Sequence, residues 1–421
     1  MKRVLIISYS FNNDQVIGSV RMRGLAKYLK EFGWNPTILT VKSHSKSSEF
    51  DSVETNYEED IISVWKKKIG FTNGTALKGN IGVNNNKNKK SFLNSFVKFS
   101  SEIVTYPDTH KGWLKPALES GNKLLKENKF DAIVSTYPVA TCHLIAKKLS
   151  ENHDLPWIAD YRDLWSQNHY KNYSKIRKHL DTKLEIKTLK SAKAITTISD
   201  PLKEKLNEIH NDKEIYTIMN GFDPKQINPG TEISKKFSIT YTGTLYNGIR
   251  DPEPLLISIN ELITDGIIDP KDMKLQFYGP KEDWLEKDIE KNNLSEVTEI
   301  FGEISRDLSI QKQREAQLLL LITANDPREK GFFTGKLFDY LAAERPIFHI
   351  GVKNGVIEKL LKKTNTGIST DNINDIKLEL ERFYGDYIVN KEVSYHGLKN
   401  EVNKYNHKSM AKKFSDILDS L

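Results

Sequence analysis

Short apolar runs recur along the whole chain, and they constrain its fold more than any other feature of the sequence. The runs have four to seven residues, and segments with helical periodicity separate them. Strands that are apolar throughout are typical of parallel sheets covered by helices on both faces. Five runs fall in the first half of the chain and six in the second; they begin at Val4, Pro36, Ala132, Pro156 and Ala194, and at Ser238, Leu275, Glu299, Leu318, Pro346 and Thr366.

Each half of the chain has enough of these runs for one doubly wound α/β domain. A chain of 421 residues is also long for a single core. Between the halves lies IYTIMNGFDP, in which Gly and Pro are typical of a hinge. We therefore expect two Rossmann-like domains facing a cleft, residues 1–218 and 219–400, with a helix over 401–421 that packs back on the first domain.

The composition is that of a soluble globular protein, with 38% hydrophobic residues, 28% charged residues and a mean hydropathy of −0.54. No apolar run approaches the ~20 residues that a membrane helix needs. The start, MKRVLIISYS, is interpreted as a first strand rather than a signal peptide. The single cysteine, Cys142, excludes an intrachain disulfide and a cysteine-based zinc site. We expect a cytoplasmic protein.

The positive charge is concentrated in one stretch. The net charge is +7, and residues 61–101 contain eight lysines and no acidic residue, so the remaining residues sum to −1. An apolar stripe flanked by lysines describes an interfacial helix on an anionic membrane. The other interpretation is that the stripe packs on the first domain and the lysines are solvated. Binding of single-stranded nucleic acid usually needs stacking aromatic residues interleaved with basic ones. The aromatic residues here have helical spacing instead, so we expect no nucleic-acid partner. The stripe is Phe92, Phe96, Phe99 and Ile103, and the lysines beside it are Lys87, Lys89, Lys90 and Lys98.

Two loops of the first domain follow apolar runs and carry candidate binding residues. Gly18 precedes an amphipathic segment, where a glycine lets a diphosphate approach free N–H groups. It is not part of a G-x-G-x-x-G fingerprint, and an ordinary strand–helix turn would also need a glycine. Farther along, Asp160, Arg162 and Asp163 occupy four positions at the end of a strand. They form either a polar site or an Arg–Asp pair that braces a loop.

In the second domain, YTGTLYNGIRDP follows a strand and combines Gly243 and Gly248 with one cation, Arg250. A glycine-rich backbone and a guanidinium suit a diphosphate, because guanidinium binds phosphate oxygens in a bidentate manner.

The stretch TGKLFDYL opens another helix, with Thr334 as the expected N-cap, followed by Gly335. Lys336 lies in the first turn, where a cation opposes the helix dipole unless an anion binds there. Asp339 lies on the same side of the helix and could accept hydrogen bonds from ribose hydroxyls. A capped core helix with an incidental Lys–Asp pair is the alternative.

The sequence contains no Asp-x-Asp clamp, no H-x-x-x-H pair and no complete Walker A loop. Arg250, Lys336 and helix N-termini could neutralise phosphates without a metal. We therefore expect no metal and no cofactor.

These loops, in their order and spacing, resemble glycosyltransferase family 4, and especially its bacterial surface-polysaccharide branch. The resemblance runs along nearly the whole chain, through IGSVRMRGLAKYL, PDTHKGWLKPA, LPWIADYRDLW, AITTIS, IMNGFD, YTGTLYNGIRDP, FYGP, FGEIS and TGKLFDYLAAERPI. It implies the GT-B fold of two Rossmann-like domains, metal-independent transfer and retention of anomeric configuration without a protein nucleophile.

The resemblance also assigns roles by position. Gly18 matches the glycine that approaches the transferred sugar and phosphates, and Ile304 matches the position that contacts the base. Arg162 stands where many members have a histidine, with Asp163 beside it as an orienting or sugar-contacting residue. The remaining matches are Gly243 and Thr244 at the usual Gly-Arg pair, with Arg250 as the substitute cation; Asp339 at the second glutamate of E-x7-E; and Gly331 at the first.

We therefore expect a hexosyl- or N-acetylhexosaminyl-transferase that uses a nucleotide diphosphate sugar, with a UDP-sugar as donor. The acceptor expected from the resemblance is a glycan or a polyprenyl-linked sugar at the cytoplasmic face of the membrane. Two alternatives stay open: a sugar-nucleotide epimerase or hydrolase of the same fold, and a non-catalytic scaffold.

Overall fold

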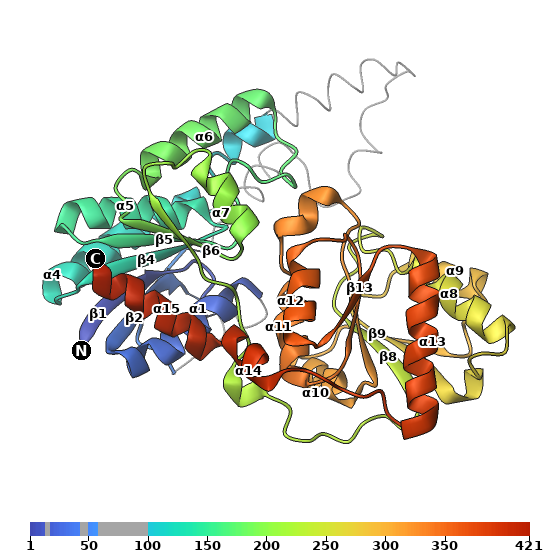
Figure 1. The fold of residues 1–421 in the computed structure, drawn as a ribbon. Helices are drawn as coiled ribbons and strands as arrows, with labels where there is room; N and C mark the ends of the chain where they lie inside the picture. Colours follow the sequence, from blue (N-terminus) through green and yellow to red (C-terminus); the bar gives the residue numbers. More distant parts are fainter. Residues whose placement is uncertain (13–16, 43–48, 58–99) are drawn as a thin grey trace, which may run out of the picture. The chain divides into compact units, whose positions relative to one another are not determined.

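The computed structural model describes residues 1–12, 17–42, 49–57 and 100–421. The chain divides into two compact units (Figure 1). The first unit comprises Met1–Ile218 and Ala411–Leu421, and the second comprises Met219–Met410. The division falls after residue 218, and of residues 401–421 the part Ala411–Leu421 belongs with the first unit.

A parallel sheet of seven strands forms the centre of the first unit, in the order β3-β2-β1-β4-β5-β6-β7. The connections run outwards in both directions from β1 and β4, which is the doubly wound arrangement. The strands are β1 (Lys2–Ile7), β2 (Trp34–Val41), β3 (Ser52–Thr55), β4 (Ala132–Tyr137), β5 (Trp157–Tyr161), β6 (Ala194–Thr197) and β7 (Glu214–Thr217).

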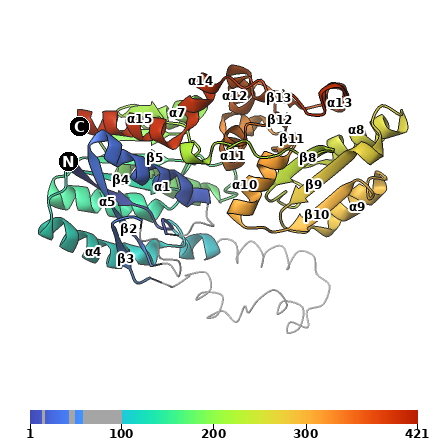
Figure 2. The ribbon, with the colours of Figure 1, turned by 90° about the horizontal axis from the view of Figure 1, so that it is seen from below.

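Helices cover both faces of this sheet (Figure 2). The C-terminal helix lies beside α1, because the Arg21 guanidinium sits 5.4 Å above the ring of Phe414. It also reaches the start of β1, where the Lys2 ammonium pairs with Asp419 at 2.9 Å. The helices of this unit are α1 (Ile17–Leu29), α4 (Leu114–Glu127), α5 (Ala140–His153), α6 (Lys175–Leu189) and α7 (Asp200–Asn207), together with the last part of α15 (His407–Ser420).

The second unit has a six-stranded parallel sheet in the order β10-β9-β8-β11-β12-β13. Its strands are β8 (Phe237–Thr242), β9 (Met273–Tyr278), β10 (Thr298–Gly302), β11 (Leu318–Ile322), β12 (Ile347–Ile350) and β13 (Gly367–Thr370). Its helices are α8 (Glu253–Thr264), α9 (Asp283–Lys291), α10 (Arg306–Glu315), α11 (Gly335–Ala343), α12 (Val356–Thr364), α13 (Ile373–Asn390) and α14 (Lys399–Val402). Short 3-10 helices occupy Lys30–Phe32, Lys111–Trp113, Pro224–Gln226, Pro270–Asp272, Pro327–Gly331 and Asn403–Tyr405.

The eleven apolar runs of the sequence all become strands. Two further strands contain no such run and were not predicted. They are β3 and β7, the two edge strands of the first sheet. Each has four residues, only one of which is buried. An edge strand buries less of its surface than a central strand, so no continuous apolar run marks these two.

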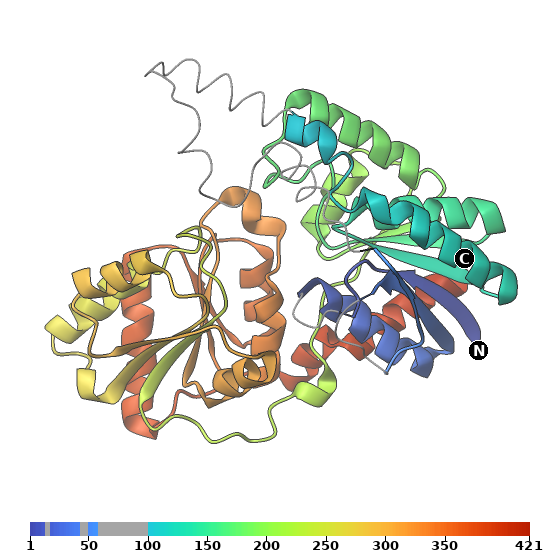
Figure 3. The ribbon, with the colours of Figure 1, turned by 180° about the vertical axis from the view of Figure 1, so that it is seen from behind.

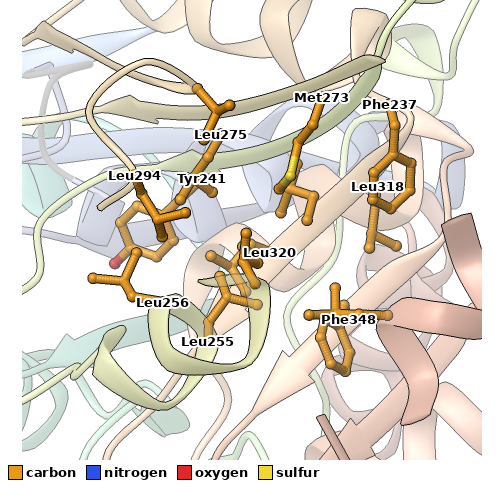
Figure 4. Packing of buried hydrophobic residues seen from close by; sticks show 14 of the residues in the cluster. Phe237, Tyr241, Leu255, Leu256, Met273, Leu275, Leu294, Leu318, Leu320 and Phe348 are labelled. Atoms are coloured by element: carbon orange, nitrogen blue, oxygen red, sulfur yellow. The ribbon is translucent and has the colours of Figure 1, made fainter. Parts of the chain in front are cut away.

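The central strand β11 shows why its sequence is apolar throughout. Leu318, Leu320 and Ile322 pack in one cluster with α8, α9 and α13 (Figure 4). Leu319 and Leu321 point to the other face and pack with α11 and α12. Burial of each such side chain stabilises the fold by about 1.5–3 kcal/mol.

Among the described residues, no helix has the length and apolar character needed to cross a bilayer.

Candidate functional site

The strand order of the second unit brings two loops of the expected donor site together. β8 and β11 are neighbours, and the chain leaves them towards opposite edges of the sheet. Ligands of open α/β sheets bind at the carboxyl ends of the strands at this switch point. Gly243 follows β8, and Lys336 lies in the first turn of the helix that follows β11. The two residues therefore meet at the position where a ligand is expected.

Lys336 is a half-buried cation in an aromatic setting. Its Nζ donates a hydrogen bond to the Tyr241 Oη at 2.6 Å and lies 3.8 Å from the centre of the same ring. Burial, and after it the charge of Arg250, lower the pKa of Lys336 well below its ordinary value of 10.5. Lys336 forms no ion pair with any residue that the structure describes. A bound anion would favour its charged form.

Arg250 belongs to the same cluster. Its Nη1 donates to the Thr244 carbonyl at 3.3 Å, and the Tyr241 hydroxyl donates to that carbonyl at 2.8 Å. The guanidinium also lies 4.5 Å above the ring of Tyr246. The structure thus places four of the predicted donor-binding residues together: Gly243, Thr244, Arg250 and Lys336.

Gly243 is required by its surroundings. Its φ of +112° is one that side chains rarely adopt, and a Cβ there would lie 3.0 Å from both Cε and Nζ of Lys336. On its other side, the carbonyl oxygen of Gly243 would lie 2.2 Å from a Cβ at Gly279. The absence of a side chain at Gly243 therefore permits the close approach of the lysine.

Helix α11 begins without a side-chain cap. Thr334 is its N-cap residue, with extended backbone, but its side chain accepts no hydrogen bond from the helix, contrary to the usual role of threonine there. Gly335 is the first helical residue. The first N–H groups of a helix have no partner within it, so they can donate to an anion beside Lys336.

Asp339 has a partner that the sequence did not indicate. Arg306 Nη2 and Nη1 donate to its two carboxylate oxygens at 2.8 and 3.3 Å. Burial raises the pKa of Asp339, although the charge and hydrogen bonds of Arg306 act in the opposite direction. Arg306 is the first residue of α10, two positions after the half-buried Ile304. A cation at the start of a helix opposes the dipole, and this signal could have identified Arg306 as it did Lys336.

In the first unit, two predicted residues from distant loops are in contact. A Cβ at Gly18 would lie 2.8 and 2.9 Å from Nη1 and Nη2 of Arg162. The Arg162 Nε donates to the carbonyl of Tyr137 at 3.0 Å. Burial lowers the pKa of Arg162, and the charge of the adjacent Asp163 opposes that shift. Arg162 therefore lies at the carboxyl ends of β4 and β5, against the first turn of α1.

Asp160, in contrast, braces the fold. Its side chain has no exposed surface and accepts hydrogen bonds from Arg21 at 2.8 Å, Thr196 at 2.7 Å and Thr136 at 3.1 Å. The bracing Arg–Asp pair exists, but Arg21 of α1 is the partner rather than Arg162. A carboxylate held in this way is unsuited to exchanging protons with a substrate.

Within the described residues, no three His, Cys, Asp or Glu side chains gather as a metal site.

Some predicted residues cannot be placed. The expected membrane-facing residues lie outside the described part of the chain, so their role stays a prediction: Lys87, Lys89, Lys90, Phe92, Phe96 and Phe99.

Comparison with known proteins agrees with the fold expected from the sequence. Residues 96–226 match the model of Glycosyltransferase Family 4. A comparison with curated proteins found no match. Among solved structures, sucrose-phosphate synthase from Thermosynechococcus elongatus aligns over 100% of this chain and 99% of its own, with a TM-score of 0.64 and 12% identity. Anabaena Alr3699/HepE in complex with UDP and glucose aligns over 100% of both chains, with a TM-score of 0.60 and 11% identity.

A third structure, WaaG, a glycosyltransferase involved in lipopolysaccharide biosynthesis, aligns over 99% of both chains with a TM-score of 0.58 and 12% identity. The predicted GT-B fold of two parallel-sheet domains is thereby confirmed. The family match and this fold together identify the chain as a glycosyltransferase of the GT-B type.

Proposed function

We propose that this protein transfers a sugar from a UDP-sugar to a glycan or polyprenyl-linked acceptor in surface-polysaccharide synthesis, with retention of configuration and without a metal. The observation that carries the proposal is the cluster of Lys336 and Arg250 around Gly243, at the switch point between β8 and β11. Two structures of similar fold support the donor and the pathway: Anabaena Alr3699/HepE was solved in complex with UDP and glucose, and WaaG is involved in lipopolysaccharide biosynthesis.

The diphosphate is the part of the donor that this cluster would bind. When the bond to the sugar breaks, negative charge develops on the leaving diphosphate. Stabilisation of that charge lowers the barrier only if it is stronger in the transition state than in the bound substrate. Lys336, Arg250 and the first N–H groups of α11 supply two charges and a dipole, which is the role that a divalent metal fills in other transferases.

The other predicted residues extend this assignment along the donor. Asp339 would accept hydrogen bonds from the ribose, and Ile304 would contact the base. In the first unit, Gly18 and Arg162 would approach the transferred sugar, with Asp163 as an orienting group. Retention without a protein nucleophile needs no carboxylate at the anomeric carbon, so the burial of Asp160 is compatible with the proposal.

Single substitutions test the phosphate assignment. Lys336→Ala and Arg250→Ala should each lower donor turnover by about 100-fold, because one donor to a developing oxyanion contributes about that factor. The matched controls are Lys359→Ala and Arg382→Ala, which remove the same charges from exposed positions on α12 and α13. Turnover within threefold of wild type for both site variants would contradict the assignment.

The donor and the reaction are tested by two further measurements. A panel of UDP- and GDP-sugars should raise the melting temperature selectively for the true donor, because binding to the native state stabilises it. Incubation of that donor without an acceptor distinguishes the alternatives. Rapid epimerisation or stoichiometric hydrolysis would favour an epimerase or hydrolase, and binding without any turnover would favour a scaffold.

A further inference from the structure

Helix α6 has an unusual distribution of side chains. Its buried face is charged: Arg177, Asp181 and Glu185 recur every four residues and are at most 3% exposed. The Arg177 Nε donates to Asp181 at 3.0 Å, and Glu185 accepts a hydrogen bond from the Ser166 N–H at 2.9 Å. These buried contacts fix the rotation of the helix about its axis, so its outer face is set by the fold.

The outer face of α6 carries large apolar side chains. Ile176, Leu180 and Ile186 are 62%, 43% and 45% exposed. The helical segment 100–104 runs beside α6 (Figures 1 and 3), since the Tyr106 hydroxyl donates to the Leu180 carbonyl at 3.2 Å. It adds Ile103, which is 59% exposed. Two neighbouring elements thus present isoleucine and leucine to solvent on one surface.

The exposed surface of α6 is also strongly basic. Every exposed charge on α6 and at its C-cap is a lysine, because its two acidic residues are buried. None of these lysines forms an ion pair with a residue in the described part of the chain. The five are Lys175, Lys178, Lys183, Lys187 and Lys190.

We propose that this α6 surface, formed by α6 and residues 100–106, docks the protein on an anionic lipid membrane. Five cations that form no ion pair with a described residue complement a negatively charged surface, and the exposed aliphatic side chains can enter the boundary between headgroups and acyl chains. Lysine stems can extend along the apolar surface while their ammonium groups reach the phosphates. An anionic bilayer offers acyl chains to the apolar side chains and phosphates to the basic ones.

The position of this surface gives the docking a function. In the parallel sheet, α6 runs opposite to the strands, so its N-terminus follows the connection that leaves the carboxyl end of β5. Arg162 lies at that same edge of the sheet. A lipid-linked acceptor in the docked membrane would be presented close to Arg162. This last step rests on the proposed function, whereas membrane docking itself does not.

The experiment measures sedimentation of the full chain with vesicles, in the absence of any donor. One set is phosphatidylcholine alone and the other contains about one third phosphatidylglycerol. The test variant is Lys183→Gln/Lys187→Gln/Lys190→Gln. The control, Lys359→Gln/Lys362→Gln/Lys363→Gln, removes the same charge from exposed positions of α12. A second test variant, Ile176→Ser/Leu180→Ser, removes the apolar contribution without changing the charge.

Wild type and the α12 control should bind the anionic vesicles and be released by about 0.5 M NaCl, because screening is then strong. The triple α6 variant should lose more than tenfold in partitioning, since each lysine near an anionic surface contributes a factor of about five. The Ile176→Ser/Leu180→Ser variant should also bind more weakly. Unchanged melting temperatures would show that the variants fold.

Equal binding to both kinds of vesicle, or equal loss in the α12 control, would overturn the proposal. So would a concentration-dependent dimer that the α6 variants abolish while no vesicle binding occurs, because the surface would then bind a second copy. Donor turnover with a soluble acceptor should be unchanged in the α6 variants. Failure of docking and failure of the proposed transfer can therefore be told apart.

Discussion

Arg306 donates hydrogen bonds to both carboxylate oxygens of Asp339, at 2.8 and 3.3 Å. The pair joins the first residue of α10 to the second turn of α11, and both side chains are partly exposed. A bidentate guanidinium fixes the plane of a carboxylate and leaves lone pairs free for other donors. Arg306 is therefore placed to orient Asp339, for which we propose a contact with the ribose of the donor.

The first prediction concerns the ribose itself. Asp339→Asn should weaken binding of UDP by about 10-fold or more, since hydrogen bonds to a charged group contribute about 1.5–3 kcal/mol. Binding of 2′-deoxy-UDP should change less, because it lacks one of the hydroxyl donors. Arg306→Gln should also reduce the preference for UDP over 2′-deoxy-UDP, but by a smaller factor. Calorimetric titration of both nucleotides measures the ratio, and an unchanged ratio in Asp339→Asn would exclude a contact with the 2′-hydroxyl.

The second prediction uses two glycines with positive φ. Gly243→Ala places a methyl group 3.0 Å from the Lys336 ammonium, whereas Gly266→Ala, at φ +72°, has nothing within 4 Å. Both substitutions should lower stability by about 1–2 kcal/mol through backbone strain. Only Gly243→Ala should also weaken UDP binding, by tenfold or more. If both variants bind UDP equally well, the contact between Gly243 and Lys336 does not shape the donor site.

The third prediction follows from the lowered pKa of Lys336. Between that pKa and 10.5, the unfolded chain binds more protons at this residue than the folded chain does. This group therefore makes stability increase as pH rises through that window. A diphosphate would raise the pKa again, so UDP binding there should take up protons and weaken with increasing pH.

Calorimetry of UDP binding in alkaline buffers of different ionisation enthalpy measures this proton uptake. Lys336→Arg should bind without it, because an arginine stays charged. Lys359→Arg, on the exposed face of α12, should behave as wild type. Uptake that persists in Lys336→Arg would assign the proton to another group.

The fourth prediction separates bracing from chemistry in the first unit. Arg21→Met leaves the Asp160 carboxylate buried without its partner, which should cost about 3–5 kcal/mol of unfolding free energy. Arg21→Met/Asp160→Asn should recover part of that loss. Lys123→Met breaks the exposed pair with Glu127 and should cost less than about 1 kcal/mol. Tryptophan fluorescence in urea reports mainly on this unit, because five of the six tryptophans precede residue 219.

Acid should reproduce the effect of losing the pair between Arg21 and Asp160. Burial raises the pKa of Asp160, but the charge and hydrogen bonds of Arg21 outweigh it, so the pKa lies below its ordinary value of 3.8. The pair therefore stabilises the fold above pH 3.8, and the contribution is lost as the pH falls through the lowered pKa.

The sequence predicts the parts of this molecule that depend on local pattern. Continuous apolar runs identify buried parallel strands, and the doubly wound order then brings the loops after β8 and β11 together. That is why Gly243 and Lys336 could be assigned to one site. The contact between Gly18 and Arg162 arises in the same way from β1 and β5.

Side-chain partners were not predictable, because they depend on how each element is rotated. The bond between Lys336 and Tyr241 spans 95 residues and requires both the register of β8 and the angle of α11. Arg306 meets Asp339 only because α10 and α11 turn these residues towards each other. Helix α6 departs from the usual rule, since a buried network holds Arg177, Asp181 and Glu185 inside. Periodicity alone would assign that face to solvent.

Transfer of a sugar to an acceptor is the central claim, and its most direct test is to follow both products of one reaction. The protein is incubated with UDP-sugars and a lipid-linked glycan extract, and mass spectrometry quantifies free UDP and glycosylated acceptor. The account predicts equal amounts of the two products, and loss of both in Lys336→Ala but not in Lys359→Ala. Release of UDP together with free sugar, and with no glycosylated acceptor, would contradict it.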